Sequence, residues 1–309
     1  MTNELFKPNS YAFGGTEYMV SLFRKHIEPE LPILKSYNCI LLPGYLPSMQ
    51  ELILDEREII LWIHNPLNQF EPQLLLDLTH PKILEKIKAV IVVSHYLKSI
   101  IVNELNIDKN KVFVIYNVIE PILNNIERFK QVDIPKIIYT SSADRGLDIL
   151  LESIPKIKEN IEVNIFSNHY PDIHSMDINY DSRINFYGLT PRKTVRKALS
   201  ESHIFAYPCT FNETFCISLG DAISANCLPI HTDQAALVEI GLRKGMVYEF
   251  SQNNHVDKFS EILEEAILRI KSNCYDPKDN ANNINERYSL QKFKTNWFEF
   301  TQQHLYLFE

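Results

Sequence analysis

Short apolar runs alternate with amphipathic stretches along the whole chain. In its first part, the runs at residues 40–42, 59–63, 89–93 and 112–115 are rich in Ile and Val. Such runs predict strands that are buried on both faces. Helical patterns lie between them, at residues 71–88 and 96–105. This alternation is typical of a parallel sheet covered by helices on both sides.

The pattern pauses at residues 117–135, which contain two prolines and several asparagines and predict a linker. It then resumes with strands predicted at residues 136–140, 163–166, 184–187, 204–207 and 228–231. Helices are predicted at residues 147–158, from Pro191 with Thr190 as N-cap, from about Thr214, and in a tail from about Asp276.

The pattern therefore predicts an α/β protein with two doubly wound domains, residues 1–130 and 131–290. A C-terminal helix, residues 291–309, is expected to pack back on the first domain. Ligands of open α/β sheets bind at the carboxyl ends of the strands. We therefore expect a ligand in a cleft between the two domains.

Composition narrows the function classes. The chain has 309 residues, of which 45% are hydrophobic and 23% charged, as expected of two ordinary globular domains. Its net charge of −8 does not favour a nucleic-acid partner. The five cysteines show no zinc spacing and predict reduced thiols in a cytoplasmic protein. We expect no signal peptide and no transmembrane segment, because no apolar run approaches about 20 residues.

The eight glycines suggest places where backbone approaches a ligand. Gly14 and Gly15 precede a helical pattern at residues 16–25, and Gly146 follows a predicted strand. A helix N-terminus behind such a loop favours phosphate. For any one of these glycines alone, an ordinary turn is the preferred interpretation. No dinucleotide-binding or P-loop glycine motif is present.

The strongest chemical signal lies between Tyr207 and Ala222. A strand is predicted to end at Pro208, a polar loop carries Glu213, and a helix follows with Asp221 about two turns inside. A helix N-terminus presents free N–H groups to a diphosphate. Carboxylates on either side of it could accept hydrogen bonds from a sugar and from a ribose. The alternative is that Glu213 is an ordinary acid near a helix start.

This segment resembles the GT-B glycosyltransferases of the large retaining family 4, the glycosyl transferases group 1 type. Its E-x7-E motif corresponds to Glu213-x7-Asp221, and the sequence continues to a Leu-Pro-led strand as in that family. Further similar segments follow in order: Gly14-Gly15-Thr16-Glu17, Val92-Val93-Ser94, Val114-Ile115-Tyr116-Asn117 and Arg145-Gly146-Leu147. Together they cover roughly residues 11–240, and their order is more specific than any one of them.

The resemblance implies a role for each candidate residue. It implies catalytic roles for Glu213 on the donor sugar, Arg145 on the diphosphate and His64 at the sugar. It implies donor binding by Gly14, Gly15, the amides of Thr214, Phe215 and Cys216, and by Asp221 on the ribose. The implied donor is a nucleotide-diphosphate sugar, UDP- or GDP-linked, and no further cofactor is expected. No metal is expected either, because no Asp-x-Asp triplet is present.

Three features depart from the family pattern. The second acid of the motif is Asp221 instead of Glu, Asn226 replaces a glycine after the helix, and residues 140–144 contain no second basic residue. His64 has a second interpretation as a core histidine. A basic cluster at residues 192–197 is interpreted as a solvated helix face in preference to a phosphate clamp.

The predicted function is a retaining glycosyltransferase that moves a sugar from the donor to an acceptor hydroxyl. The acceptor is expected to be a glycan or lipid-linked glycan, and a modified DNA base is possible but not favoured. The main alternative is a non-catalytic sugar-nucleotide-binding module on the same fold. An epimerase or a phosphorylase of this architecture is a third class, which no motif supports.

Overall fold

The computed structural model describes residues 5–7, 14–69, 71–123, 126–167, 181–242, 245–250 and 252–305. The chain forms two compact units, one made of Met1–Val118 with Leu290–Glu309 and the other of Ile119–Ser289. The chain therefore passes from one unit to the other after Val118 and after Ser289, where the sequence pattern placed boundaries after residues 130 and 290.

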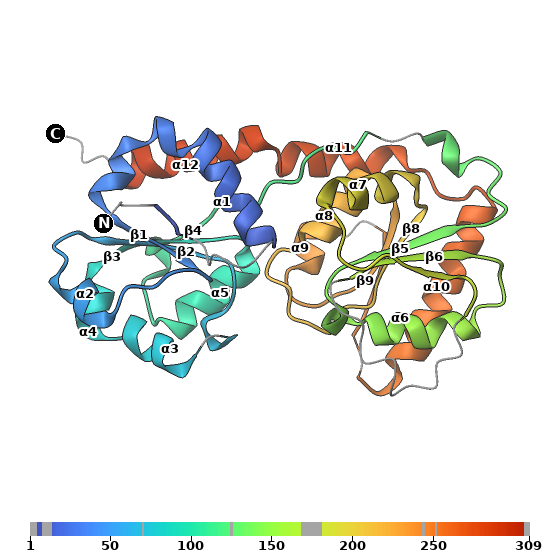
Figure 1. The fold of residues 1–309 in the computed structure, drawn as a ribbon, viewed down its shortest axis with the longest axis horizontal. Coiled ribbons are helices and arrows are strands. Elements are labelled where there is room, and N and C mark those ends of the chain that lie inside the picture. The colour runs from blue at the N-terminus through green and yellow to red at the C-terminus, as the bar shows by residue number, and fades with distance from the viewer. Residues whose placement is uncertain are drawn as a thin grey trace. The chain divides into compact units, whose positions relative to one another are not determined.

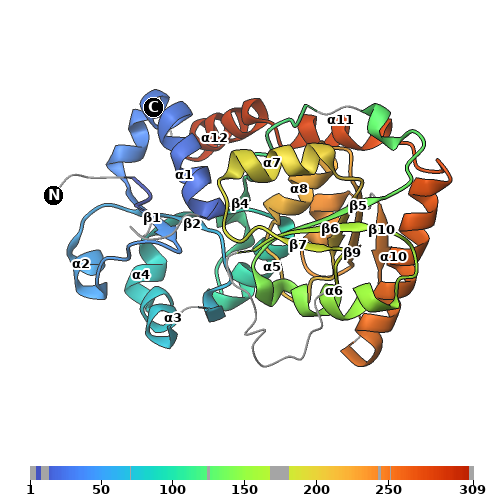
Figure 2. The ribbon, with the colours of Figure 1, turned by 45° about the vertical axis from the view of Figure 1, so that its right-hand side comes forward.

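The first unit contains a parallel four-stranded sheet in the order β1-β2-β3-β4 (Figure 1). Its strands are β1 (Asn38–Leu42), β2 (Ile59–Ile63), β3 (Ile87–Val92) and β4 (Val112–Val114). Its helices are α1 (Gly15–His26), α2 (Met49–Leu54), α3 (Pro72–Leu78), α4 (Pro81–Lys86), α5 (His95–Glu104) and α12 (Leu290–His304). Helices α1 and α12 cover one face of this sheet, and α2 to α5 lie on the other (Figures 1 and 2).

An aromatic cluster joins the end of the chain to the core of the first unit. The ring of Trp297 in α12 lies 4.8 Å from that of Phe23 in α1 and 5.4 Å from that of Trp62 in β2. Edge-to-face contacts of this kind add to the burial of large apolar surfaces. The C-terminal helix is therefore part of this unit's hydrophobic core.

The second unit contains a parallel six-stranded sheet in the order β10-β9-β8-β5-β6-β7. Its strands are β5 (Lys136–Thr140), β6 (Glu162–Phe166), β7 (Ile184–Phe186), β8 (Ile204–Tyr207), β9 (Leu228–Thr232) and β10 (Met246–Tyr248). Its helices are α6 (Leu147–Ser153), α7 (Arg192–Glu201), α8 (Ile217–Ser224), α9 (Leu237–Gly241), α10 (His255–Lys271) and α11 (Lys278–Arg287). Helices α7, α8 and α11 cover one face of the sheet, and α6 and α10 cover the other (Figures 1 and 2).

Strand order in the second sheet reverses beside β5. The chain runs outward from β5 to β6 and β7, and then returns to place β8 on the other side of β5. The loops that follow β5 and β8 therefore leave the same edge of the sheet in opposite directions. Such a switch point is the usual ligand site of an open α/β sheet.

Several predicted elements differ from the observed ones. The single helix expected over residues 71–88 is two helices, α3 and α4, because Pro81 disfavours helical backbone at the preceding His80, which is extended. Helix α7 begins at Arg192, with Pro191 as its N-cap in place of Thr190. The sequence pattern predicts no element over residues 232–275, although they contain α9, β10 and the 17-residue α10.

Candidate functional site

The switch point of the second unit brings Arg145 and Glu213 together. Arg145 ends the short 3-10 turn Ala143–Arg145, which follows β5, and Glu213 lies in the loop between β8 and α8. The two residues are 68 positions apart, yet Nη1 of Arg145 donates a 2.7 Å hydrogen bond to Oε1 of Glu213. Their neighbourhood follows directly from the pairing of β5 with β8.

Gly146 allows the two loops to approach closely. Its φ of +90° is a left-handed conformation that favours glycine. A Cβ atom at this position would lie 2.0 Å from the carbonyl oxygen of Pro208, directly after β8. Only a residue without a side chain fits here, so the glycine helps to place Arg145 beside the loop of Glu213.

Arg145 is held as a cation by its surroundings. Its guanidinium lies 3.4 Å from the ring centroid of Phe211, in a cation–π contact. Burial opposes the charge, but the carboxylate of Glu213 and other nearby groups outweigh it, and the pKa of Arg145 is raised. Among the described residues, Nη2 of Arg145 has no hydrogen-bond partner.

One oxygen of Glu213 receives two donors. In addition to Arg145, the hydroxyl of the fully buried Tyr207 donates a 2.5 Å hydrogen bond to Oε1. Burial is the main cause that raises the pKa of Tyr207 well above its usual range, so this group is a neutral hydroxyl. Within the described part of the chain, Oε2 of Glu213 has no hydrogen-bond partner, and the side chain is 13% exposed.

The helix after this loop begins later than predicted. Thr214 and Phe215 belong to the loop, and α8 begins at Ile217 with Cys216 as its N-cap. Cys216 has φ 62° and ψ 77°, a conformation that strains a residue with a side chain and that is often found at functional sites. The first N–H groups of a helix have no backbone partner inside it, so the N-terminus of α8 favours an anionic ligand.

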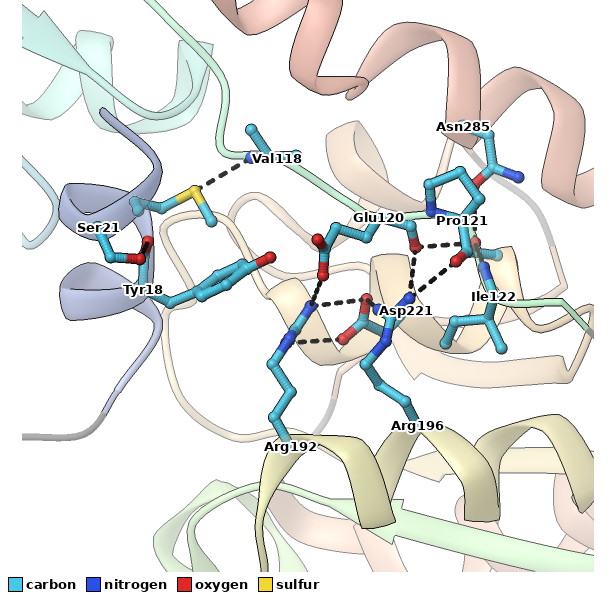
Figure 3. A network of polar contacts seen from close by, with 12 residues as sticks. Tyr18, Ser21, Val118, Glu120, Pro121, Ile122, Arg192, Arg196, Asp221 and Asn285 are labelled. Atoms are coloured by element: carbon cyan, nitrogen blue, oxygen red, sulfur yellow. Dashed lines mark hydrogen bonds and ion pairs between the residues drawn. The ribbon is translucent and has the colours of Figure 1, made fainter. Parts of the chain in front are cut away.

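Asp221 does not join Glu213. The prediction placed it about two turns inside a helix that opens near Thr214, whereas it is the fifth residue of α8. Its side chain is 4–5% exposed, and its carboxylate forms ion pairs with Arg196 at 2.9 Å and Arg192 at 3.0 Å (Figure 3). Burial raises the pKa of Asp221, and the two guanidinium groups oppose that rise. The second acid of the motif is thus already occupied by two cations.

The interpretation of residues 192–197 as a solvated face is wrong for two of its members. Arg192 and Arg196 point at Asp221, whereas Lys193 and Lys197 are exposed. Arg196 also donates hydrogen bonds to the backbone oxygens of Glu120 and Pro121, in the segment that enters the second unit (Figure 3). The sequence of α7 contains both its exposed lysines and the arginines that face Asp221, but it does not show that α7 lies beside α8.

The remaining candidates belong to the first unit. Gly14 is the N-cap of α1 and donates its N–H to the side chain of Glu17 at 2.8 Å, and the exposed Gly15 begins the helix. His64 directly follows β2 but is only 3% exposed, with its ring 4.9 Å from that of Trp62. Burial lowers the pKa of His64 to about 3, so its imidazole is neutral at pH 7. Burial in this aromatic surrounding is what the interpretation as a core histidine predicts.

Sequence reasoning missed the supporting residues of the site. It did not assign a role to Tyr207, Phe211, Arg192 or Arg196. Tyr207 carried one usable signal, since it is a polar-tipped residue at the end of a buried strand.

The described residues contain no group of three His, Cys, Asp or Glu side chains placed to hold a metal ion. No helix in the described ranges has the length and apolar character needed to span a membrane.

Residues 134–268, most of the second unit, match the family model described as Glycosyl transferases group 1. This segment is similar to the glycosyl transferases group 1 family. The matched region contains Arg145, Tyr207, Glu213 and Asp221, which are the residues just described. A comparison with curated proteins found no match.

Solved structures extend the likeness to the rest of the chain. A glycosyltransferase from Rickettsia africae has a TM-score of 0.65 at 15% identity, over 97% of this chain and 84% of that one. HepE from Anabaena, in complex with UDP and glucose, has a TM-score of 0.69 at 11% identity, over 97% and 86%. The sucrose-phosphate synthase of Thermosynechococcus elongatus has a TM-score of 0.65 at 14% identity, over 96% and 82%.

The fold is GT-B, with two parallel-sheet α/β domains. The match to the glycosyl transferases group 1 family and this fold together support sugar transfer from a nucleotide sugar.

Proposed function

We propose that this protein is a retaining glycosyltransferase that uses a nucleotide-diphosphate sugar without a metal ion. The observation that carries the proposal is the pair of open groups at the switch point. Nη2 of Arg145 is an unused cationic donor, and Oε2 of Glu213 is an unused anionic acceptor, within the described residues. One suits a phosphate and the other a sugar hydroxyl.

The two groups bind different parts of the donor. Oε2 of Glu213 accepts a hydrogen bond from a hydroxyl of the donor sugar, and Arg145 donates hydrogen bonds to the diphosphate. The amides of Thr214, Phe215 and Cys216 and the N-terminus of α8 add donors on the same phosphates. The roles that the resemblance implies for Gly14, Gly15 and His64 of the first unit stay predictions.

The reaction breaks the bond between the anomeric carbon and the diphosphate oxygen. Negative charge then develops on that oxygen, and the fixed cation of Arg145 stabilises it. The acceptor hydroxyl attacks the anomeric carbon on the face that the leaving group vacates, and its proton passes to a donor phosphate oxygen. The products are a nucleoside diphosphate and a glycoside of unchanged anomeric configuration.

Asp221 contributes through its arginines. Direct contact with a ribose would require its carboxylate to leave two guanidinium groups at about 3 Å. Separating a buried ion pair leaves uncompensated charges and costs several kcal/mol, on the order of 3–5. We therefore expect backbone groups or bridging water to contact the ribose, and Asp221 to hold α7 against α8.

The test measures nucleoside diphosphate release from UDP-, GDP- and ADP-linked sugars, with water, glycans, lipid-linked glycans and DNA carrying a hydroxylated base as acceptors. Glu213→Ala and Arg145→Ala should each reduce release about 100-fold or more. Lys193→Ala and Glu201→Ala, on the exposed part of α7, are matched controls and should leave it unchanged. Release that survives both site substitutions contradicts the proposal.

A second candidate function is a sugar-nucleotide-binding module without turnover. The buried cluster of Asp221 with Arg192 and Arg196 favours it, because only one acid of the motif remains open to a ligand. It predicts tight binding of a sugar nucleotide in calorimetry and no release with any acceptor. Product formation on one acceptor is sufficient to exclude it.

A further inference from the structure

Tyr207 is the last residue of β8, and its whole side chain is buried. A buried phenol needs a partner for its hydroxyl, since leaving it unsatisfied is costly. Its partner here is Oε1 of Glu213 at 2.5 Å, with Oγ of Ser141 at 3.3 Å on the same hydroxyl. The hydroxyl therefore links the loops after β5 and β8 at the candidate site.

Two donors on one oxygen fix the direction of the carboxylate. Arg145 and Tyr207 both bond Oε1 of Glu213, so the carboxylate can rotate only by breaking one of these bonds. Arg145 is also the proposed partner of the diphosphate, and its guanidinium must serve both groups. The Tyr207 hydroxyl has no such second task, so it holds Oε1 while a donor is bound.

We infer that Tyr207 is a positioning residue, whose hydroxyl holds Oε1 of Glu213 so that Oε2 meets a hydroxyl of the donor sugar. The inference rests on the proposed function, and it states that Glu213, positioned by Tyr207, recognises the sugar of the donor. Tyr207 touches neither the nucleotide nor the phosphates in this scheme. Its loss should therefore weaken binding of the sugar nucleotide and spare binding of the free nucleoside diphosphate.

The experiment compares two ligands on the same variants by calorimetry. The probes are UDP-glucose with UDP, UDP-N-acetylglucosamine with UDP, GDP-mannose with GDP and ADP-glucose with ADP. For the pair that the wild type binds, Tyr207→Phe should weaken the sugar nucleotide about tenfold, the effect of losing one hydrogen bond to a charged group. Affinity for the free nucleoside diphosphate should change less than about twofold.

Tyr248→Phe is the matched control. Tyr248 also ends a strand of this sheet and is buried, but its hydroxyl bonds Nε2 of His255 at 2.6 Å. It should change neither affinity. A purely structural role for Tyr207 would instead weaken both ligands together, and an equal loss for both would overturn the inference.

The double variant isolates the path through Glu213. In a Glu213→Ala background the carboxylate is absent, so Tyr207→Phe should cause no further loss of sugar-nucleotide affinity. An additional tenfold loss there would contradict positioning through Glu213. Donor analogues that lack one sugar hydroxyl at a time sharpen the test, because the analogue missing the hydroxyl held by Oε2 should bind wild type and Tyr207→Phe equally.

Ser141→Ala keeps the inference testable if Tyr207→Phe does not fold. It removes the second contact of the Tyr207 hydroxyl and should weaken the sugar nucleotide about two- to threefold, with the nucleoside diphosphate unaffected. An unchanged ratio of the two affinities would count against the inference. Failure of wild type to bind any of the four pairs would instead refute the proposed function, so the two failures are distinguishable.

Discussion

The two acids of the motif, Glu213 and Asp221, both bond arginine, but their surroundings differ in one respect. Glu213 has both of its donors on one oxygen and keeps the other open. Asp221 is bonded on both oxygens by Arg192 and Arg196 and lies behind them, 4% exposed. The comparison shows that two acids at motif spacing can have different tasks, one toward a ligand and one toward the fold.

The largest expected effect is on stability, from Asp221→Ala. Removing this carboxylate takes the nearest acid away from both guanidinium groups and leaves Arg192 with Glu120 at 4.0 Å. Loss of one partner of a buried pair costs about 3–5 kcal/mol of the free energy of unfolding. Urea denaturation with Glu213→Ala alongside makes the comparison direct. Equal losses for the two variants would show that the acids do not differ as described.

Arg196→Met probes the same cluster from α7. It removes the bond to Asp221 and the bonds to the backbone oxygens of Glu120 and Pro121, while Arg192 still pairs the acid. We expect a loss of about 2 kcal/mol, because buried acceptors remain partly unsatisfied. Lys193→Met on the exposed side of the same helix should stay within about 0.5 kcal/mol. A loss as small as this control would place Arg196 outside the stabilising network.

His64, like Asp221, is a buried group that serves the fold, and it makes the free energy of unfolding depend on pH. Its pKa is lowered to about 3, whereas an unfolded histidine titrates near 6.5. The unfolded state thus binds one more proton between these values, and stability present above about pH 6.5 is lost as the pH falls towards 3. The slope from this group is about 1.4 kcal/mol per pH unit.

The measurement is the free energy of unfolding of wild type and His64→Asn between pH 7 and pH 4. The difference between the two proteins isolates this histidine from His203 and His255, whose pKa values burial also lowers. Parallel curves for the two proteins would mean that His64 is not buried as a neutral group.

Among the substitutions at the two motif acids and their partners, Glu213→Gln should have the smallest effect on stability. The amide oxygen of Gln can still accept from Tyr207 and Arg145, and the side chain is partly exposed, so the loss should stay below about 1 kcal/mol. The same variant should lose most of the thermal shift that a sugar nucleotide gives the wild type, because a neutral oxygen accepts a hydroxyl more weakly. A large loss of stability would move Glu213 into the same class as Asp221.

Much of the fold was predictable because buried parallel strands have a local signature. The strands β2, β3, β5, β8 and β9 were placed within one or two residues of their observed bounds. Helix α10 carries an equally local signal, because its buried residues include Phe259, Leu263, Ile267 and Ile270 at helical spacing. The start of α8 at Ile217 was not predictable in this way, since the left-handed Cys216 delays it.

By itself, the sequence determined the α/β class and the two-domain organisation, and its resemblance to a known family made Arg145 and Glu213 candidates. Apolar periodicity encodes the class and the two domains along short stretches of chain. Only the tertiary structure decided that Tyr207 bonds Glu213 and that Asp221 is closed by two arginines of α7. Those contacts depend on which strands and helices become neighbours. A local sequence pattern does not determine the order of strands across a switch point.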